Sequence, residues 1–423
     1  MLRTHTLNAL GILCIGIFLV SFTSALDFAG GNGSLINPYQ ITNWTALQQM
    51  NAGSLSGLGN RYVDGNYTLM NNLSKDDADY ASVMANWNNI GNGSSCGSRC
   101  SFTFTGSLNG NNYTIKDFYL DRPTITAVGM FGTMNGNVWN VRMENATITG
   151  KSNVGTLSST GTGKIYNSHV QGTVNITDGY GGGFARQVQN IYNSTANVSV
   201  TGFCSTGQCF IGGFVADTAT GTVDGCASFG NVVVTHTATT VPVGAFMGYA
   251  NGGSVSNSYS TGNVSGGVWT GGFMGYSNGG SIANSYSTGY VTGGTTANGG
   301  FLALINTGTY TNDYWDINTS GQATSVGGAG VVGKTTIEMK QIGTFSAWNI
   351  VNTTTERNNG YPFLAHELGN WTAKWLIWDG TTPEPPSENC WTIQDSLLII
   401  TNECADENGI IDFGQILMEV LLS

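Results

Sequence analysis

Hydrophobic and polar positions repeat with a long period in the middle of the chain. Residues 243–267 and 270–294 have nearly the same sequence, and Phe246 in the first copy aligns with Phe273 in the second. The shift of about 27 residues lies in the range of repeats that stack on their neighbours. Within each copy, short runs of alternating apolar and polar residues are separated by turns that contain Gly. This pattern predicts short β-strands wound into successive coils.

One apolar position, usually a Phe that follows Gly, marks each coil. It is occupied by Phe131, Leu157, Phe184, Phe214, Phe246, Phe273 and Phe301. A single coil cannot bury these side chains, but each Phe, Ile or Val contributes roughly 1.5–3 kcal/mol when a stack buries it. We therefore expect an all-β fold, a parallel β-helix or β-solenoid of about seven coils, with these residues as its core stack.

A polar position recurs in the middle strand of the coils. In the last clear copy, Ile282, Asn284 and Tyr286 lie on one face by the period-two alternation of a strand. With Gly225 as the exception, the Asn recurs at Asn140, Asn167, Asn193, Asn257, Asn284 and Asn312. Stacked amides can donate and accept along the axis, which favours an internal ladder over a polar ligand stripe. Earlier coils carry Arg142, His169 and Thr195 at the Tyr position, so the inward face is defined only for the later coils.

The residues on either side of the repeats predict caps and a separate tail. Asn43, or the Thr before it, is expected to cap a short helix over Trp44 to Met50. Thr335, or the Thr after it, is expected to begin another over Ile337 to Ile342. The expected domains are a signal peptide (1–25), an N-terminal cap (26–105), the solenoid (106–316), a C-terminal cap (317–378), a Pro-rich linker (379–389) and a disulfide-closed β tail (390–423).

The first 25 residues have the pattern of a secretory signal peptide. Arg3 supplies a positive charge, residues 10–22 are mainly apolar, and Thr23-Ser24-Ala25 supplies the small residues of a cleavage site. The apolar run is shorter than the about 20 residues that span a membrane. We expect a secreted or cell-surface protein, and an uncleaved signal anchor is the alternative that would attach it to a membrane.

Export changes the interpretation of the cysteines, because disulfides persist in oxidising compartments. Three pairs are close in sequence and are expected to form local disulfides: Cys96–Cys100, Cys204–Cys209 and Cys390–Cys404. Loops this short contribute on the order of 2 kcal/mol each, so they pin loops rather than build the fold. Cys226 remains, and it stands where other coils carry Ser168, Ser194, Ser258 and Ser285. We expect a packed free thiol there.

Composition narrows the classes of partner. Charged residues make up 9% of the chain, Gly occurs 62 times and aromatics make up 11%, which fits turn-rich β-structure rather than disorder. The net charge is −11 and no basic stripe is present, so nucleic acid is not an expected partner. Sequons such as Asn263-Val-Ser occur throughout and would permit glycosylation, so a glycoprotein is one expectation.

Several stretches resemble the GLUG-motif repeat family, which is named for a Gly-Leu-x-Gly core. Here that core usually carries Phe, as in Gly272-Phe273-Met274-Gly275, and Tyr314-Trp315-Asp316 and Tyr361-Pro362-Phe363-Leu364 resemble flanking stretches of the same proteins. The resemblance covers roughly Leu26 to Leu364. Such repeats occur in bacterial and archaeal surface proteins, in adhesin-like proteins and beside the catalytic domain of IgA-specific metallopeptidases. The resemblance therefore implies an extracellular β-solenoid with an adhesive role.

The sequence contains no convincing catalytic or metal motif. His366-Glu367-Leu368-Gly369-Asn370 is the nearest match to a zinc-peptidase His-Glu-x-x-His, but Asn replaces the second His. Between Thr126 and Gly300 the acidic residues are Glu144, Asp178, Asp217 and Asp224. Asp217 is expected to align with uncharged residues on neighbouring coils, so no stacked acidic pair for glycoside chemistry results. We expect no catalytic residue, metal or cofactor, with a polysaccharide lyase or glycosidase as the alternative.

Binding remains as the main functional class. Outward-facing Tyr249, Trp269 and Tyr276 are candidate glycan-facing residues, because an aromatic ring offers an apolar face beside hydrogen-bonding groups. Partners would be surface glycans or other cell-surface proteins. The sequence thus predicts a non-catalytic, structural or adhesive surface protein. A second alternative is a scaffold module related to IgA-specific metallopeptidases that lacks their zinc site.

Overall fold

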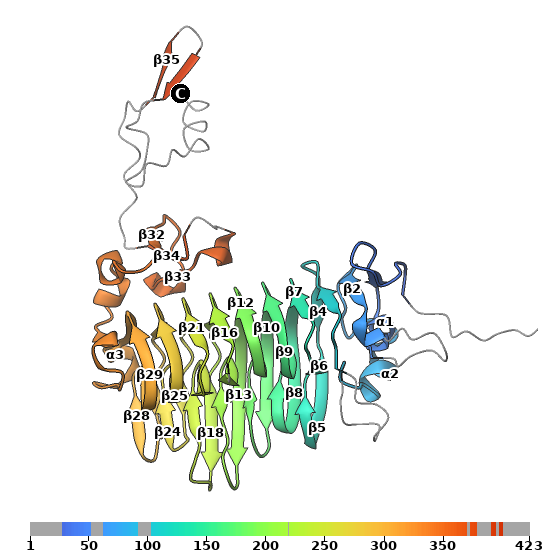
Figure 1. Ribbon diagram of the computed structural model, residues 1–423, viewed down its shortest axis with the longest axis horizontal. Helices are drawn as coiled ribbons and strands as arrows, with labels where there is room; N and C mark the ends of the chain where they lie inside the picture. Colours follow the sequence, from blue (N-terminus) through green and yellow to red (C-terminus); the bar gives the residue numbers. More distant parts are fainter. Residues whose placement is uncertain are drawn as a thin grey trace, which may run out of the picture.

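The solenoid is visible as a stack of parallel strands along one axis. The computed structural model describes residues 28–51, 62–91, 103–218, 220–369, 373–378, 391–394 and 397–400. N-terminal elements lie at one end of the stack and later strands follow in order toward the other (Figure 1). The expected signal peptide and Pro-rich linker and the expected disulfides Cys96–Cys100 and Cys390–Cys404 lie outside the described residues.

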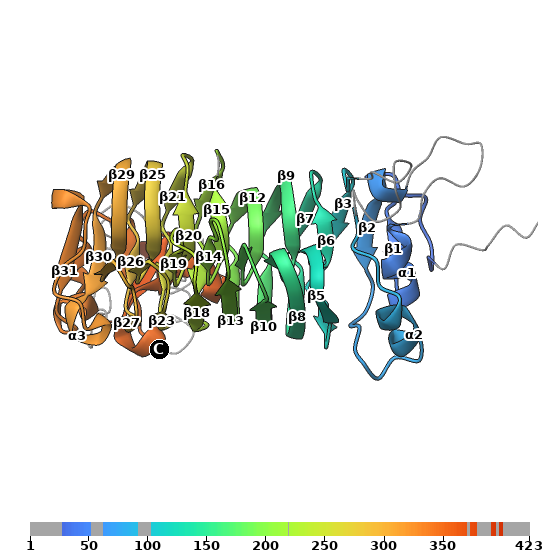
Figure 2. The same ribbon diagram turned by 90° about the horizontal axis from the view of Figure 1, so that it is seen from below.

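One face of the stack is a 13-stranded sheet within the described residues. Its strands are β1 (Tyr39–Ile41), β2 (Asn66–Leu69), β3 (Ser107–Asn109), β6 (Phe131–Thr133), β7 (Asn137–Trp139), β9 (Ser158–Tyr166), β12 (Ala185–Tyr192), β15 (Val215–Thr218), β16 (Thr222–Asp224), β20 (Met247–Ala250), β21 (Ser254–Ser256), β25 (Met274–Ala283) and β29 (Leu302–Thr311). All pair in parallel, and Met247 faces Met274 in the register that the repeat predicts. Figure 2 shows these strands side by side.

The second sheet forms the remaining sides of the coils. Its strands are β4 (Thr114–Lys116), β5 (Tyr119–Val128), β8 (Arg142–Gly155), β10 (His169–Ile176), β11 (Gly181–Gly182), β13 (Thr195–Cys204), β14 (Ile211–Gly212), β17 (Ala227–Ser228), β18 (Val232–His236), β19 (Pro242–Gly244), β22 (Tyr259–Ser260), β23 (Val264–Ser265), β24 (Trp269–Gly271), β26 (Tyr286–Ser287), β27 (Val291–Thr292), β28 (Ala297–Gly299), β30 (Asp313–Asp316) and β31 (Val331–Lys334). Its pairings close on themselves like a barrel. Long strands such as β8 contribute to this, since β8 pairs with β10 along its first part and with β11 at its end.

The predicted core stack is confirmed. All seven of its side chains are fully buried. Phe246 lies between Phe214 and Phe273, with ring centroids 4.9 Å and 4.5 Å away and nearly parallel planes. Phe273 continues the stack to Phe301 at 4.6 Å. From Phe184 to Phe301 each ring therefore meets the equivalent ring of the next coil, as the Gly-Phe recurrence predicts.

The Asn position has a different role from the predicted internal ladder. All six residues are only partly buried and have positive φ values between 46° and 55°, and Gly225 has φ 67°. Asn and Gly are the residues that adopt this left-handed conformation most readily. They turn the chain at the corner between strands such as β25 and β26. Asn312 does donate to Asn284 at 3.3 Å, but Asn257 donates to Asp224 instead.

The hydrogen-bonded ladder lies one residue later, at fully buried Ser positions. The Ser168 amide donates to Ser194 Oγ at 3.1 Å and the Ser258 amide to Ser285 Oγ at 3.2 Å. Each hydroxyl in turn donates to the carbonyl two residues before it, as Ser258 does at 2.7 Å. Cys226 is a fully buried free thiol in this row, as predicted. A buried hydroxyl is tolerated here because both its donor and its acceptor capacity are used.

The tyrosines of the repeats face outward from the coil, which corrects their predicted inward position. Tyr259 and Tyr286 belong to a second hydrophobic cluster with Trp348, Tyr361 and Trp375, apart from the solenoid core. Residues 335–369 and 373–378 supply that cluster and are called the C-terminal module below. Its elements are η4 (Glu338–Lys340), η5 (Ile342–Phe345), β32 (Ile350–Asn352), η6 (Asn358–Gly360), β33 (Phe363–Leu364), η7 (Ala365–Leu368) and β34 (Trp375–Ile377).

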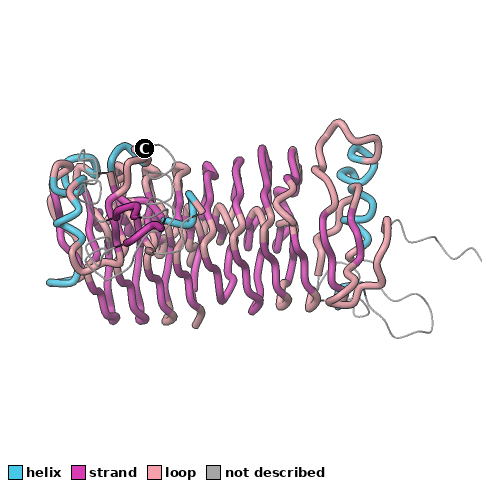
Figure 3. Tube along the Cα trace, turned by 90° about the horizontal axis from the view of Figure 1, so that it is seen from above, coloured by secondary structure: helices cyan, strands magenta, loops and turns pink. Residues whose placement is uncertain are grey.

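The C-terminal module thus lies along the side of the later coils rather than closing their end. Its small sheet of β32, β34 and β33 sits beside the stack (Figure 1), and short helices gather there and at the N-terminal end while strands form the body (Figure 3). The helix predicted over Ile337 to Ile342 is replaced by two short 3-10 turns, η4, which begins at Glu338, and η5, which begins at Ile342. At the end of the stack, β31 pairs with β30, beyond α3 (Ile317–Ser320) and η3 (Gly328–Gly330).

The N-terminal cap continues the parallel ladder. The expected helix is α1 (Trp44–Gln49), and the Ala46 amide donates to Asn43 Oδ1 at 2.7 Å. η1 (Tyr62–Asp64) and α2 (Tyr80–Ala85) complete the cap. β1 and β2 pair in order with β3, so the ladder starts before the predicted first coil.

The tail contains the predicted strand pair, β35 (Trp391–Gln394) and β36 (Leu397–Ile400), which are antiparallel. Among the described residues, no helix combines the length and the apolar character needed to cross a membrane.

Candidate functional site

Two neighbouring registers of the solenoid carry partly exposed aromatic rings, together with the buried Pro242 and Asp217. In the first register, Tyr180 and Phe210 each come one residue before a paired position, because Gly181 pairs with Ile211. Ile211 in turn pairs with Val243, and Pro242, just before it, pairs with Trp269. In the second, Asp217 pairs with Tyr249 and Tyr249 with Tyr276. Parallel coils are about 4.8 Å apart, so a register that crosses four coils spans roughly 14 Å.

The structure brings the three predicted glycan-facing residues together. Tyr249 and Tyr276 have ring centroids 5.3 Å apart, and Trp269 lies 5.6 Å from Tyr276. Phe210 stacks on Tyr249 at 4.3 Å, and Tyr180 meets Phe210 edge-on at 5.1 Å. All five rings are partly exposed. They form one continuous surface, which we call the aromatic row.

Tyr180 and Phe210 were missed by the sequence analysis, although a signal for them exists. Both residues lie four positions before a core Phe, and Trp269 holds the same place before Phe273. The Gly residues between this position and the core Phe vary little from copy to copy. The repeat is therefore recognised from its Gly-Phe motif and not from the residue four positions before the Phe. Comparing the copies at that position would have identified the row.

A buried ion pair adjoins the aromatic row. Arg186 contacts Asp217 at 3.0 Å, and its guanidinium carbon lies 5.2 Å from the Tyr180 ring centroid. Burial raises the pKa of Asp217, although the Arg186 charge opposes this shift. One carboxylate oxygen of Asp217 and the Arg186 Nε have no hydrogen-bond partner within the described residues. The pair therefore carries unused polar capacity beside the rings.

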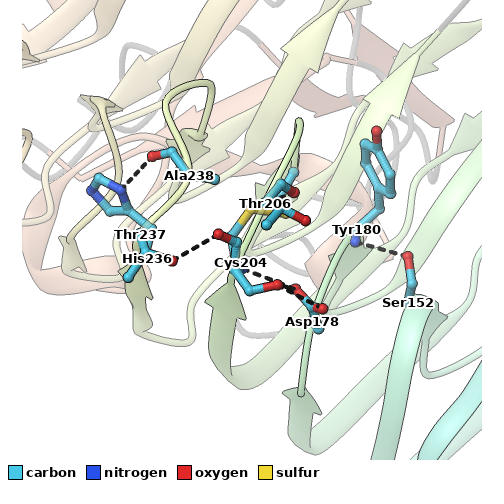
Figure 4. The surroundings of a disulfide bond; sticks show 10 residues. Ser152, Asp178, Tyr180, Cys204, Thr206, His236, Thr237 and Ala238 are labelled. Carbon is cyan, nitrogen blue, oxygen red and sulfur yellow. Dashed lines mark hydrogen bonds between the residues drawn. A yellow bond between two sulfur atoms is a disulfide. The ribbon is translucent and has the colours of Figure 1, made fainter.

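The disulfide loop stands next to the same surface. Cys204 and Cys209 form the expected disulfide, and the Asp178 carboxylate accepts from the Ser205 amide and hydroxyl at 2.9 Å (Figure 4). The 232–240 extension runs along this loop, because β18 pairs with β13 and Thr237 donates to the Cys204 carbonyl. The disulfide loop and the 232–240 extension thus contact each other and form one projection from two neighbouring coils.

A pocket of about 580 Å³ opens where the C-terminal module meets the earlier coils. The solenoid contributes Arg142, His169 and Thr195 in consecutive register positions. The module contributes Arg357, His366 and Glu367. Later coils carry Tyr at the register position of Arg142, His169 and Thr195. This register, which is distinct from the aromatic row, therefore changes to polar residues where the module ends.

Burial shapes the electrostatics of this pocket. His169 Nδ1 lies 2.8 Å from Thr195 Oγ1, in a hydrogen bond whose direction depends on the His169 tautomer. Burial, together with the nearby Arg142, lowers the pKa of His169 to about 4. Burial raises the pKa of Glu367, which accepts from the Tyr259 hydroxyl at 2.9 Å. His366 Nε2 donates to the Gly225 carbonyl at 3.0 Å. Burial also lowers the pKa of His366.

Within the described residues, no group of three or more His, Cys, Asp or Glu side chains is placed to hold an ion. His366 and Glu367 are instead used to dock the module on the coils.

Comparisons with known proteins agree with the fold. No family model matches the chain, so the resemblance to GLUG repeats stays an expectation. A stretch of 154 residues, 36% of the chain, is 35% identical to halomucin of Haloquadratum walsbyi and spans 2% of that protein. A crystal structure described as a "putative immunoglobulin A1 protease" from Bacteroides ovatus matches 79% of the chain and 94% of its own, with 22% identity and a TM-score of 0.50. At that identity the likeness concerns the fold.

Proposed function

We propose that this is a cell-surface or secreted protein that binds glycans through the aromatic row and has no catalytic activity. The observation that carries the proposal is the unbroken contact of Tyr180, Phe210, Tyr249, Tyr276 and Trp269 across neighbouring coils. Similarity of one stretch to halomucin, a surface-associated protein, supports the location.

A row of partly exposed rings suits an extended sugar chain. Aromatic rings present apolar faces that can cover sugar rings, and Tyr hydroxyls and the Trp indole N–H supply hydrogen bonds at the edges. The roughly 14 Å spanned by four coils would place several sugar units on the row at once. The fixed coil spacing holds the rings in place before the ligand arrives, which lowers the ordering cost of binding.

A glycan array compares the wild type with Trp269→Ala and Tyr276→Ala. Each variant should weaken binding about 5- to 30-fold, since stacking on an aromatic ring contributes on the order of 1–2 kcal/mol. Tyr290→Ala is the matched control, because Tyr290 is 53% exposed and makes no ring contact with the row. Absence of signal on every glycan, or equal loss in the control, would refute glycan binding through this row.

The lack of catalysis is tested separately. Incubating the protein with acidic and neutral polysaccharides should produce no new reducing or unsaturated ends. Turnover that disappears in Asp217→Asn, with circular dichroism unchanged, would instead establish the alternative of a polysaccharide-active enzyme.

A further inference from the structure

The pocket between the C-terminal module and the earlier coils gathers charged groups of both signs in a chain that has few charges. The whole protein has 14 Lys and Arg residues and four His. Two of those histidines, His169 and His366, line this pocket together with two Arg–Glu pairs, Arg142 with Glu144 and Arg357 with Glu367. Its volume of about 580 Å³ lies within the range of small-molecule sites.

Arg142 is the least committed charged group of the pocket. Its side chain is 52% exposed, and it forms an ion pair with Glu144 at 3.8 Å that is too long for a hydrogen bond, so its N–H groups can still turn to a ligand. Arg357, in contrast, donates to the Glu367 carbonyl at 3.0 Å and helps to hold η7 in place. A planar guanidinium with free N–H groups favours a carboxylate, which it can bind through two parallel hydrogen bonds.

The other lining residues suit a ring with several hydroxyl groups. Gln171 and Asn197 are exposed and bring amide donors and acceptors, and Thr195 adds a hydroxyl. Phe229 is partly exposed and is held edge-on against Tyr259 at 5.6 Å, so it offers an apolar face. One apolar wall with surrounding polar groups is the usual composition of a site that orients a small polar ligand.

We propose that this pocket binds an acidic sugar, a single pyranose unit that carries a carboxylate, with Arg142 contacting the carboxylate and Phe229 the sugar ring. Gln171, Thr195 and Asn197 supply hydrogen bonds to ring hydroxyls. This site is separate from the aromatic row and does not depend on the function proposed for it. The module completes the site, so binding also requires that the module is docked.

Isothermal titration calorimetry of the full chain with D-glucuronate tests the proposal, with D-glucose as the neutral match. Glucuronate should bind one to one and glucose should bind at least tenfold more weakly. Arg142→Gln should weaken glucuronate binding at least tenfold, and Arg142→Lys should have an intermediate effect because it keeps the charge but loses the paired geometry. Lys164→Gln removes an exposed charge outside the pocket and should leave binding unchanged.

Arg142→Gln should change the free energy of unfolding little, because the Arg142 side chain is 52% exposed. Equal affinity for glucose and glucuronate, or unchanged affinity in Arg142→Gln, would overturn the proposal. Inorganic sulfate that binds as tightly as glucuronate would reduce the pocket to a simple anion site and would also overturn it. Trp269→Ala should retain glucuronate binding, so failure at the aromatic row and failure at this pocket can be told apart.

Discussion

Replacing Tyr286 by Phe should weaken the docking of the C-terminal module on the coils without disturbing the solenoid. Tyr286 is fully buried, and its hydroxyl donates to the Pro362 carbonyl at 2.5 Å and accepts from Asn358 Nδ2 at 2.6 Å. Two such bonds contribute roughly 1–3 kcal/mol in total. Asn358 also donates to the Pro362 carbonyl at 2.9 Å, so that carbonyl keeps one partner. We therefore expect a loss of about 1–2 kcal/mol in the docking free energy.

Native-state hydrogen exchange measures this loss locally. Amides of β34, at Trp375 to Ile377, should exchange about 5–30 times faster in the variant, since about 1.4 kcal/mol corresponds to a factor of ten. Amides of the core strands, such as those of β20, should keep their protection. Tyr290→Phe is the control, because Tyr290 is 53% exposed. Unchanged exchange of the β34 amides, or loss of protection in all strands together, would show that the module is not docked as an independent unit through Tyr286.

Three further predictions concern the solenoid. Phe246→Ala should cost about 3–5 kcal/mol in chemical denaturation, because the ring is fully buried between two stacked neighbours; a loss below 1 kcal/mol would contradict the stack. Replacing Cys204 and Cys209 by Ser should cost about 2 kcal/mol and leave far-ultraviolet circular dichroism unchanged, because the disulfide closes a short loop. Burial raises the pKa of Asp313, so the stability it contributes is present at low pH and is lost as pH rises through its folded pKa. Asp313→Asn keeps the acceptor for the Ser285 amide but loses the oxygen that accepts from the Thr311 amide at 3.3 Å; because it cannot ionise, it should flatten this pH dependence in urea unfolding.

The core could be predicted from the sequence because its period is carried by one residue type. Phe246, Phe273 and the equivalent residues stack with equivalent residues, so alignment of the copies gives the register directly. Asp217 pairing with Tyr249 follows from the same alignment. Nothing beyond the repeat itself was needed for these predictions, since each coil contacts mainly its neighbours.

The direction of the Tyr side chains could not be predicted in the same way. Period-two alternation places Ile282 and Tyr286 on one face only if the strand is unbroken. Asn284 adopts a left-handed conformation between them, which turns the chain and changes the face. Moreover, the groups that bury Tyr259 come from 108 residues later in the chain, at Glu367. An apolar residue buried by a distant module gives the same sequence pattern as one buried in the coil.

The repeat also explains where specific chemistry can arise in this protein. Register positions are equivalent in every coil, so a change of residue along a row places a new group at a fixed spacing from its neighbours without changing the backbone. The outward row changes from Tyr286 and Tyr259 to Thr195, His169 and Arg142, and the pocket opens along this change. The register four positions before the core Phe likewise varies, with aromatic residues in some coils and Pro242 in another. Differences between copies, rather than the conserved core positions, therefore determine what each face of the solenoid can bind.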